Sequence, residues 1–238
     1  PITKTIEKAI TLGTGKVQVA GVLSIGEHGN YPYTPKTKQH MYPRRRFFDE
    51  IADTFRKCGQ VVPVFNDKHL AYNWKDAKHM YDRARKMKIP FMAGSSLPVA
   101  WRLPAKALPI GTQIEEAIGI GYSGLESYGF HALETFQSVM ERRKGGETGV
   151  ASVQAVSGEA IWKAEKEKRW SFDLLVAALR GTGVKMPVDE IRDKLGKGST
   201  IFLIEYRDGQ LGAVRIAVHS QRSGQLRHVL GGETGRSR

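Results

Sequence analysis

Residues 61–70, VVPVFNDKHL, decide the fold predicted for this chain. They form an almost wholly apolar run that ends in a polar cluster at residues 66–69. A helical pattern follows over residues 73–88, and a second apolar run, IPFMAGSS, covers residues 89–96. A helix between two strands that are apolar throughout is typical of a parallel sheet buried on both faces. Because ligands of such sheets bind beyond the carboxyl ends of the strands, we expect Lys68 to lie in an enzyme-like pocket.

The residues before this stretch continue the alternation of helix and strand. We expect a helix over residues 3–12, a strand over 17–25 and a helix over 44–57. Such alternation implies right-handed crossovers with helices on both faces of the sheet. The sequence therefore predicts an α/β fold that begins with a truncated Rossmann-like domain, residues 1–105.

Three prolines close together, Pro98, Pro104 and Pro109, mark the predicted boundary to a second domain. There we expect strands over residues 110–121, 150–156, 201–206 and 211–218, and helices over 127–143, 172–179 and 188–195. Asp208-Gly209 is a hairpin signal between the last two strands. Residues 106–219 are thus predicted to form an α+β substrate and dimerisation domain with a mainly antiparallel sheet. Residues 220–238, rich in Gly, Arg and Ser, are expected to form a flexible tail.

Composition narrows the class of protein. The 238 residues are 40% hydrophobic and contain no apolar run long enough for a membrane span. The start, PITKTIEKAI, has no secretory pattern, and a single cysteine, Cys58, fits a reducing cytoplasm. The net charge of +13 is spread along the chain among acidic residues, so nucleic-acid binding is not the favoured prediction. We interpret the dense run Arg44-Arg45-Arg46 as a solvated helix face rather than a phosphate site.

Titratable side chains collect after two of the predicted strands. Glu27 and His28 follow the first, and Asp67, Lys68 and His69 follow the second. Since neighbouring parallel strands end at the same edge of a sheet, the two clusters are expected to meet in one cleft. A lysine beside carboxylates and histidines can act as an acid, a base or an electrostatic clamp. The alternative is structural: an ion pair between Asp67 and Lys68, or Asp67 as the cap of the next helix.

Three further patterns bear on the function. His131 and Glu134 share a helix face and could bind a metal, but a helix-stabilising pair explains the spacing equally well. His79, on the polar side of its helix, is expected to be exposed to solvent. Residues 119–124 match the dinucleotide motif G-x-G-x-x-G, but the acidic residues before them and the absence of a later acid at a strand end argue against that function.

With these residues identified, the chain resembles the glucose–fructose oxidoreductase and inositol dehydrogenase family (Gfo/Idh/MocA) over residues 6–206. In that family a strand ends in Glu-Lys-Pro before a helix and a further strand. The resemblance places Lys68 at the position of the catalytic lysine, Asp67 at the Glu and His69 at the Pro. His131 matches a histidine of the second domain. Ser127, with Glu126 beside it, stands where the family has the aspartate partner of that histidine.

The chain also departs from this family. Its members begin with a strand, a glycine-rich turn and a helix that bind the nucleotide pyrophosphate, whereas this chain is expected to start after that unit. Without those backbone amides a dinucleotide loses its main anchor, which argues against NAD(P) binding and hydride transfer.

The leading hypothesis is therefore a hydrolase of small cyclic esters such as lactones, acting as a homodimer. In it His131 is the general base, and Lys68 polarises the carbonyl from a hollow that both residues share. Asp67, His69, Glu126 and Ser127 support them, and Glu27, His28 and Glu134 are candidate ligands of Zn²⁺ or Ca²⁺. The alternative is an NAD(P)-dependent oxidoreductase that acts on sugars or cyclitols. A third hypothesis is a non-catalytic sugar- or polyanion-binding module.

Overall fold

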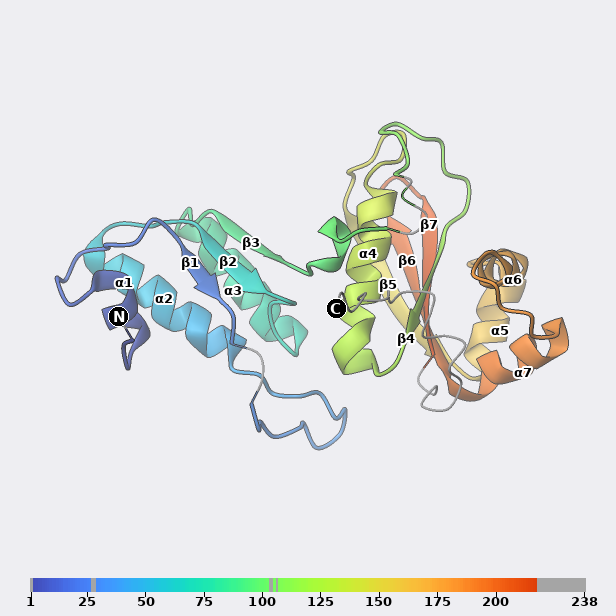
Figure 1. Ribbon diagram of the computed structural model, residues 1–238, viewed down its shortest axis with the longest axis horizontal. Helices are drawn as coiled ribbons and strands as arrows, with labels where there is room; N and C mark the ends of the chain where they lie inside the picture. Colours follow the sequence, from blue (N-terminus) through green and yellow to red (C-terminus); the bar gives the residue numbers. More distant parts are fainter. Residues whose placement is uncertain (1, 27–28, 103–104, 106, 218–238) are drawn as a thin grey trace, which may run out of the picture. The chain divides into compact units, whose positions relative to one another are not determined.

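The computed structural model describes residues 2–26, 29–102, 105 and 107–217. The chain divides into two compact units, Pro1–Ser95 and Ser96–Arg238 (Figure 1). The predicted tail, residues 220–238, lies outside the described residues. No helix of the described ranges is long and apolar enough to cross a membrane.

The first unit contains a three-stranded parallel sheet in the order β1-β2-β3. Its strands are β1 (Val22–Ser24), β2 (Val64–Asp67) and β3 (Phe91–Gly94). The helices of this unit are α1 (Ile6–Thr11), α2 (Arg44–Cys58) and α3 (Trp74–Lys86) (Figure 1). Strand order that follows chain order, with right-handed crossovers, puts the helices on one face of the sheet.

The core of this unit lies between the helices and that face. It combines Ile10 of α1, Phe48 and Phe55 of α2, Met80 of α3 and Val64 of β2, all at most 2% exposed. The other face carries Leu23 and Met92, in register through Phe65, and these two side chains are 71% and 66% exposed. The prediction that helices cover both faces is therefore wrong for the described residues, because α2 and α3 are both crossovers of the same direction.

The helix ends follow local signals. The Asn73 side chain accepts a hydrogen bond of 2.8 Å from the amide of Asp76 and so caps α3, in the position that favours Asn. Gly59 ends α2 with φ +67°, the left-handed conformation that glycine adopts at little cost. The predicted helices over 44–57 and 73–88 are thus present, with ends shifted by one or two residues.

The second unit has a four-stranded mixed sheet in the order β4-β7-β6-β5. β4 (Ile118–Tyr122) pairs in parallel with β7 (Leu211–Ala217), while β6 (Ser199–Tyr206) is antiparallel to both β7 and β5 (Val150–Ser157). The predicted Asp208-Gly209 hairpin joins β6 to β7, with φ +84° at Gly209.

Helices cover both faces of this sheet. α4 (Phe130–Met140) packs Phe136 and Met140 against β6 and β7 on one face. The other face is covered by α5 (Glu159–Lys166), α6 (Phe172–Gly181) and α7 (Val188–Gly198). Two short elements complete the unit, the 3₁₀ turn η1 (Leu97–Val99) and the π-helical turn η2 (Leu125–Gly129) before α4.

Three predictions about this unit need correction. α5 was not predicted, because it buries only two apolar side chains, Ile161 and Ala164, and its other residues are mostly charged. The strand expected from residue 110 begins only at Ile118, since Gly111 adopts φ +85° in a turn. The helix expected from residue 127 begins at Phe130, after the π-helical turn.

Candidate functional site at the carboxyl end of β2

The carboxyl end of β2 is organised by a buried asparagine. Asn66 is 1% exposed, and its side-chain amide donates to the backbone oxygens of Asp67 at 3.3 Å and His69 at 3.2 Å. Both bonds fold the chain back on itself directly after the strand. The amide of Lys68 donates to the carbonyl of Gly94 at 3.1 Å, which ties the turn to β3. The turn is therefore fixed from two sides.

Lys68 is the residue at the apex of this turn. Its φ is +69°, a left-handed conformation that costs a side-chain-bearing residue about 1 kcal/mol or more. Its Nζ lies 3.2 Å from Oδ2 of Asp67, and the two side chains are 23% and 20% exposed. The structural alternative of an ion pair is thus realised, whereas the cap of α3 is Asn73 rather than Asp67. The lysine remains at the strand end, partly accessible, as predicted.

Arg44 lies beneath the turn. It is 3% exposed, its Nη1 is 3.2 Å from Nε2 of His69, and its guanidinium lies 4.5 Å from the ring centroid of Tyr42. Because a guanidinium only donates, Nε2 of His69 is the acceptor in this contact. The prediction of a solvated helix face is therefore wrong for Arg44, although it holds for Arg46, which is exposed and pairs with Glu50.

A second polar cluster joins α2 to α3. Asp49 accepts from Nε2 of His79 at 2.9 Å and from Nη1 of Arg83 at 2.5 Å. Arg83 also bonds Asp53 at 2.7 Å. Burial raises the pKa of Asp49, but the hydrogen bonds from His79 and Arg83 outweigh it, so this pKa is lowered. His79, expected to be exposed to solvent, has a side chain that is 38% exposed and is also a partner in this cluster.

Of the other predicted site residues, two lie outside the described ranges and the rest belong to the second unit, apart from those described above. Glu27 and His28 lie outside the described residues. The strands β1 and β2 are adjacent and parallel as expected. His131 is the second residue of α4, half-buried, with ring contacts to Tyr128 and Phe130. Lys68 and His131 belong to different units, so their common pocket stays a prediction.

The supporting residues of the second unit lie near His131 in the chain. Glu126 and Ser127 belong to η2, where Glu126 is exposed, and Glu134 is half-buried on α4. Within the ranges that the structure covers, no group of three or more His, Cys, Asp or Glu is placed to hold a metal ion. The predicted metal ligands therefore gain no support from the described part of the chain.

The G-x-G-x-x-G segment is a packing motif. Gly119 and Gly121 lie inside β4 rather than in a turn. A Cβ on Gly121 would come within 2.5 Å of Ile216 and 2.8 Å of Ala132, so the absence of a side chain lets α4 approach the sheet. These glycines leave no backbone turn to hold a pyrophosphate, in agreement with the sequence argument against this motif.

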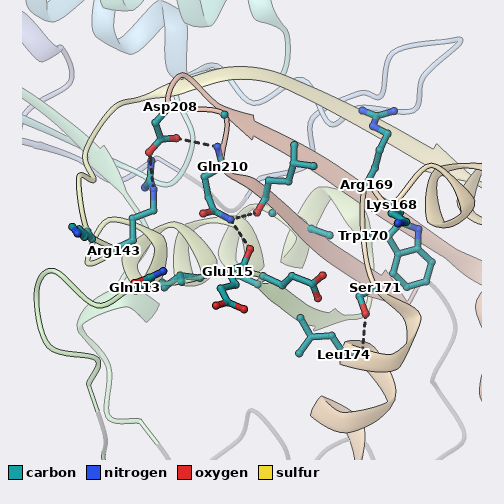
Figure 2. Close-up of a pocket in the computed structure, with 18 of the residues that line it drawn as sticks. Gln113, Glu115, Arg143, Lys168, Arg169, Trp170, Ser171, Leu174, Asp208 and Gln210 are labelled. Atoms are coloured by element: carbon teal, nitrogen blue, oxygen red, sulfur yellow. Dashed lines mark hydrogen bonds and ion pairs between the residues drawn. The ribbon is translucent and has the colours of Figure 1, made fainter.

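The sequence argument missed a cleft inside the second unit. Its volume is about 710 Å³, within the range of ordinary small-molecule sites. Figure 2 shows Arg143 and Asp208 at one end, Lys168 and Arg169 at the other, and Glu115 and Gln210 between them. These side chains are contributed by segments far apart in sequence, so no local pattern could have indicated that they meet.

Comparisons with known proteins identify structural neighbours only. No protein-family model and no curated protein matches the sequence. An NAD-binding oxidoreductase from Klebsiella pneumoniae is similar at TM-score 0.48 and 13% identity, over 91% of this chain and 51% of that one. GenD2 from gentamicin A biosynthesis, in complex with NAD, is similar at TM-score 0.46 and 13% identity, over 94% and 54%. UDP-N-acetylglucosamine 3-dehydrogenase GnnA from Acidithiobacillus ferrooxidans gives 0.40 and 10%, over 86% and 52%.

This chain spans about half the length of these structures. Their names are those of oxidoreductases and dehydrogenases, so the expectation of a lactone hydrolase is contradicted. The structural neighbours of this chain are oxidoreductases of the Gfo/Idh/MocA type, the family that its sequence resembles.

Proposed function

We propose that this chain carries the lysine-bearing part of the active site of an NAD(P)-dependent oxidoreductase that acts on sugars or cyclitols. The observation that supports the proposal most is the strained backbone of Lys68, φ +69°, at the carboxyl end of the central parallel strand. Strain of this kind persists where the surroundings enforce it, and it concentrates at functional sites. Here Asn66 and Gly94 enforce it through hydrogen bonds.

The position of Lys68 suits a hydrogen-bond donor to a substrate oxygen. An ammonium group carries three N–H donors and can bond several oxygen atoms at once, Oδ2 of Asp67 among them. In a partly buried site, a positive donor at a sugar hydroxyl or carbonyl orients that oxygen and stabilises negative charge that develops on it. Arg44 and Asn66 would then act as positioning residues that hold the turn.

The described residues fit a dinucleotide only in part. The strand ends of the three-stranded sheet lie where such sheets bind ligands. However, in the described part of the chain no glycine-rich turn leads from β2 or β3 to a helix N-terminus, and Gly119 and Gly121 are engaged in packing. The described residues therefore do not include the backbone amides that would hold the pyrophosphate. The roles proposed for Lys68, Arg44 and Asn66 concern their own side chains only.

The proposal is tested with the full-length protein in two steps. Titration with NADH and with NADPH, followed by nicotinamide fluorescence, should give saturable binding with a Kd on the order of micromolar. A panel of sugars and cyclitols with the oxidised cofactors should then include one compound that yields reduced nicotinamide. Absence of binding by both cofactors, or of turnover across the panel, would overturn the proposal.

A further inference from the structure

The cleft of the second unit has a charge pattern that the proposed oxidoreductase site does not use. All the residues that line it lie between Gln113 and Ala213, so it is formed within one unit. Hydrogen bonds hold several of its lining residues in place. Arg143 is 3% exposed and donates to Asp208 at 2.7 Å and to Thr148 at 2.8 Å. Gln210 donates to the carbonyl of Glu115 at 3.1 Å.

The charges that remain available are arranged along the cleft. Asp208 is neutralised by Arg143. Lys144, which follows Arg143 in the chain, also lines the cleft. Lys168 and Arg169 lie at the end opposite Arg143 (Figure 2). Both lysines are exposed, and within the described ranges neither forms an ion pair. Between these ends the cleft offers acceptors rather than cations.

Carboxylates and amides form another part of the cleft lining, with Glu115 and Gln210 between the two ends (Figure 2). Glu115 and Glu116 are exposed, and their side chains form no ion pair with any residue that the structure describes. With Gln113 and Gln210 they provide oxygen atoms that accept hydrogen bonds from hydroxyl groups. A ligand that matches this order is anionic at each end and carries hydroxyl groups between.

We propose that this cleft binds a small polyhydroxylated diacid, with one acid group at Lys144, the other at Lys168 and the hydroxyl groups facing Glu115 and Glu116. Opposite charges within a few ångströms in a partly screened cleft attract the ligand ends. The two carboxylates repel any acid group placed between the lysines, and therefore fix the spacing of the ligand charges. The site is independent of a nicotinamide cofactor.

Three ligands with the same six-carbon chain test the proposal. Glucarate carries an acid at both ends, gluconate at one end and sorbitol at neither. Isothermal titration of the full chain at low salt should give affinities in the order glucarate, gluconate, sorbitol, with about fivefold between neighbours for each lysine contact. Failure of glucarate to bind, or equal binding of the three, would overturn the proposal.

Lysine variants locate the site. Lys144→Met and Lys168→Met should each lower the affinity for glucarate toward that of the parent for gluconate, and the double variant should distinguish glucarate from sorbitol less than either single variant does, with Arg169 still at one end. Lys185→Met is the matched control, because Lys185 is an exposed lysine of the same unit that does not line the cleft. An equal effect of Lys185→Met, or no effect of the two cleft variants, would contradict the assignment. Because no nicotinamide is present, the result does not depend on the proposed oxidoreductase activity.

Discussion

At the scale of single residues, the sequence pattern located Lys68 but not its conformation. An apolar run that ends in polar residues indicates a strand end, and β2 ends at Asp67 as that pattern predicts. The left-handed backbone of Lys68 depends on bonds to Asn66 and Gly94, and no local signal in a lysine indicates them. The burial of Arg44 was not predicted for a related reason, since its partner His69 lies 25 residues further along the chain.

Glycine substitutions test the strain at Lys68. Lys88 has φ +55°, is exposed and belongs to the same unit, so it serves as a control without a role in the site. Lys88→Gly should raise the free energy of unfolding by about 1 kcal/mol, since glycine adopts this conformation without a Cβ clash. Lys68→Gly should raise it less, because the bond to Asp67 is lost. Chemical denaturation measures both, and a Lys68→Gly variant less stable than Lys68→Met, which also loses the bond to Asp67, would show that this backbone is not strained.

Two buried arginines should respond to substitution in opposite directions. Burial lowers the pKa of Arg215 to about 10, and the guanidinium bonds only the hydroxyl of Ser199 among the described residues. The folded state thus disfavours this cation at every pH below that value. Arg215→Met should therefore raise the free energy of unfolding by about 1–2 kcal/mol. Arg143→Met should lower it by about 3 kcal/mol, because Asp208 loses its partner. Thermal denaturation in which both variants lose stability would contradict this assignment for Arg215.

At the scale of elements, periodic apolar residues predicted the long helices well, and the misses have physical causes. α2 and α3 place Phe48, Phe55 and Met80 in the core at helical spacing, which the sequence shows directly. α5 buries only Ile161 and Ala164, so its pattern is too short to read. The open face of the first sheet was not predicted, because apolar runs do not reveal on which face each crossover helix packs.

The polar cluster between α2 and α3 predicts a dependence of stability on pH. The pKa of Asp49 is lowered from its ordinary value of 3.8, so the carboxylate stabilises the folded state above that value and this contribution is lost as the pH falls through the lower, folded-state pKa. At neutral pH, Asp49→Asn should lower the free energy of unfolding by about 1–2 kcal/mol. The difference from the parent protein should shrink in acid.

Asp82→Asn is the control for this prediction. Asp82 pairs with Lys78 within α3 and is 54% exposed, so its substitution should cost at most about 0.5 kcal/mol. Denaturation curves at neutral and acidic pH measure both variants. If Asp49→Asn lowers the free energy of unfolding equally at neutral and acidic pH, the charge of Asp49 contributes nothing to the polar cluster between α2 and α3.

At the scale of the whole molecule, the order of helices and strands along the chain was enough to predict the fold class, but it was not enough to predict the function. The parallel sheet followed by a mixed sheet matches the predicted α/β class. The expectation of a hydrolase came from a departure from the family pattern and not from side chains that indicate ester hydrolysis. Sites built from distant segments, such as the cleft of the second unit, are set by tertiary packing and could not be read from the chain.

The turnover of Lys68→Met, compared with that of Lys88→Met, tests the assigned role of Lys68 most directly. Methionine keeps the length of the side chain and removes the N–H donors. With a sugar or cyclitol that the parent protein oxidises, Lys68→Met should lower kcat by about 100-fold or more while Lys88→Met leaves it unchanged. Full activity of a folded Lys68→Met would contradict the assignment of Lys68 to the active site.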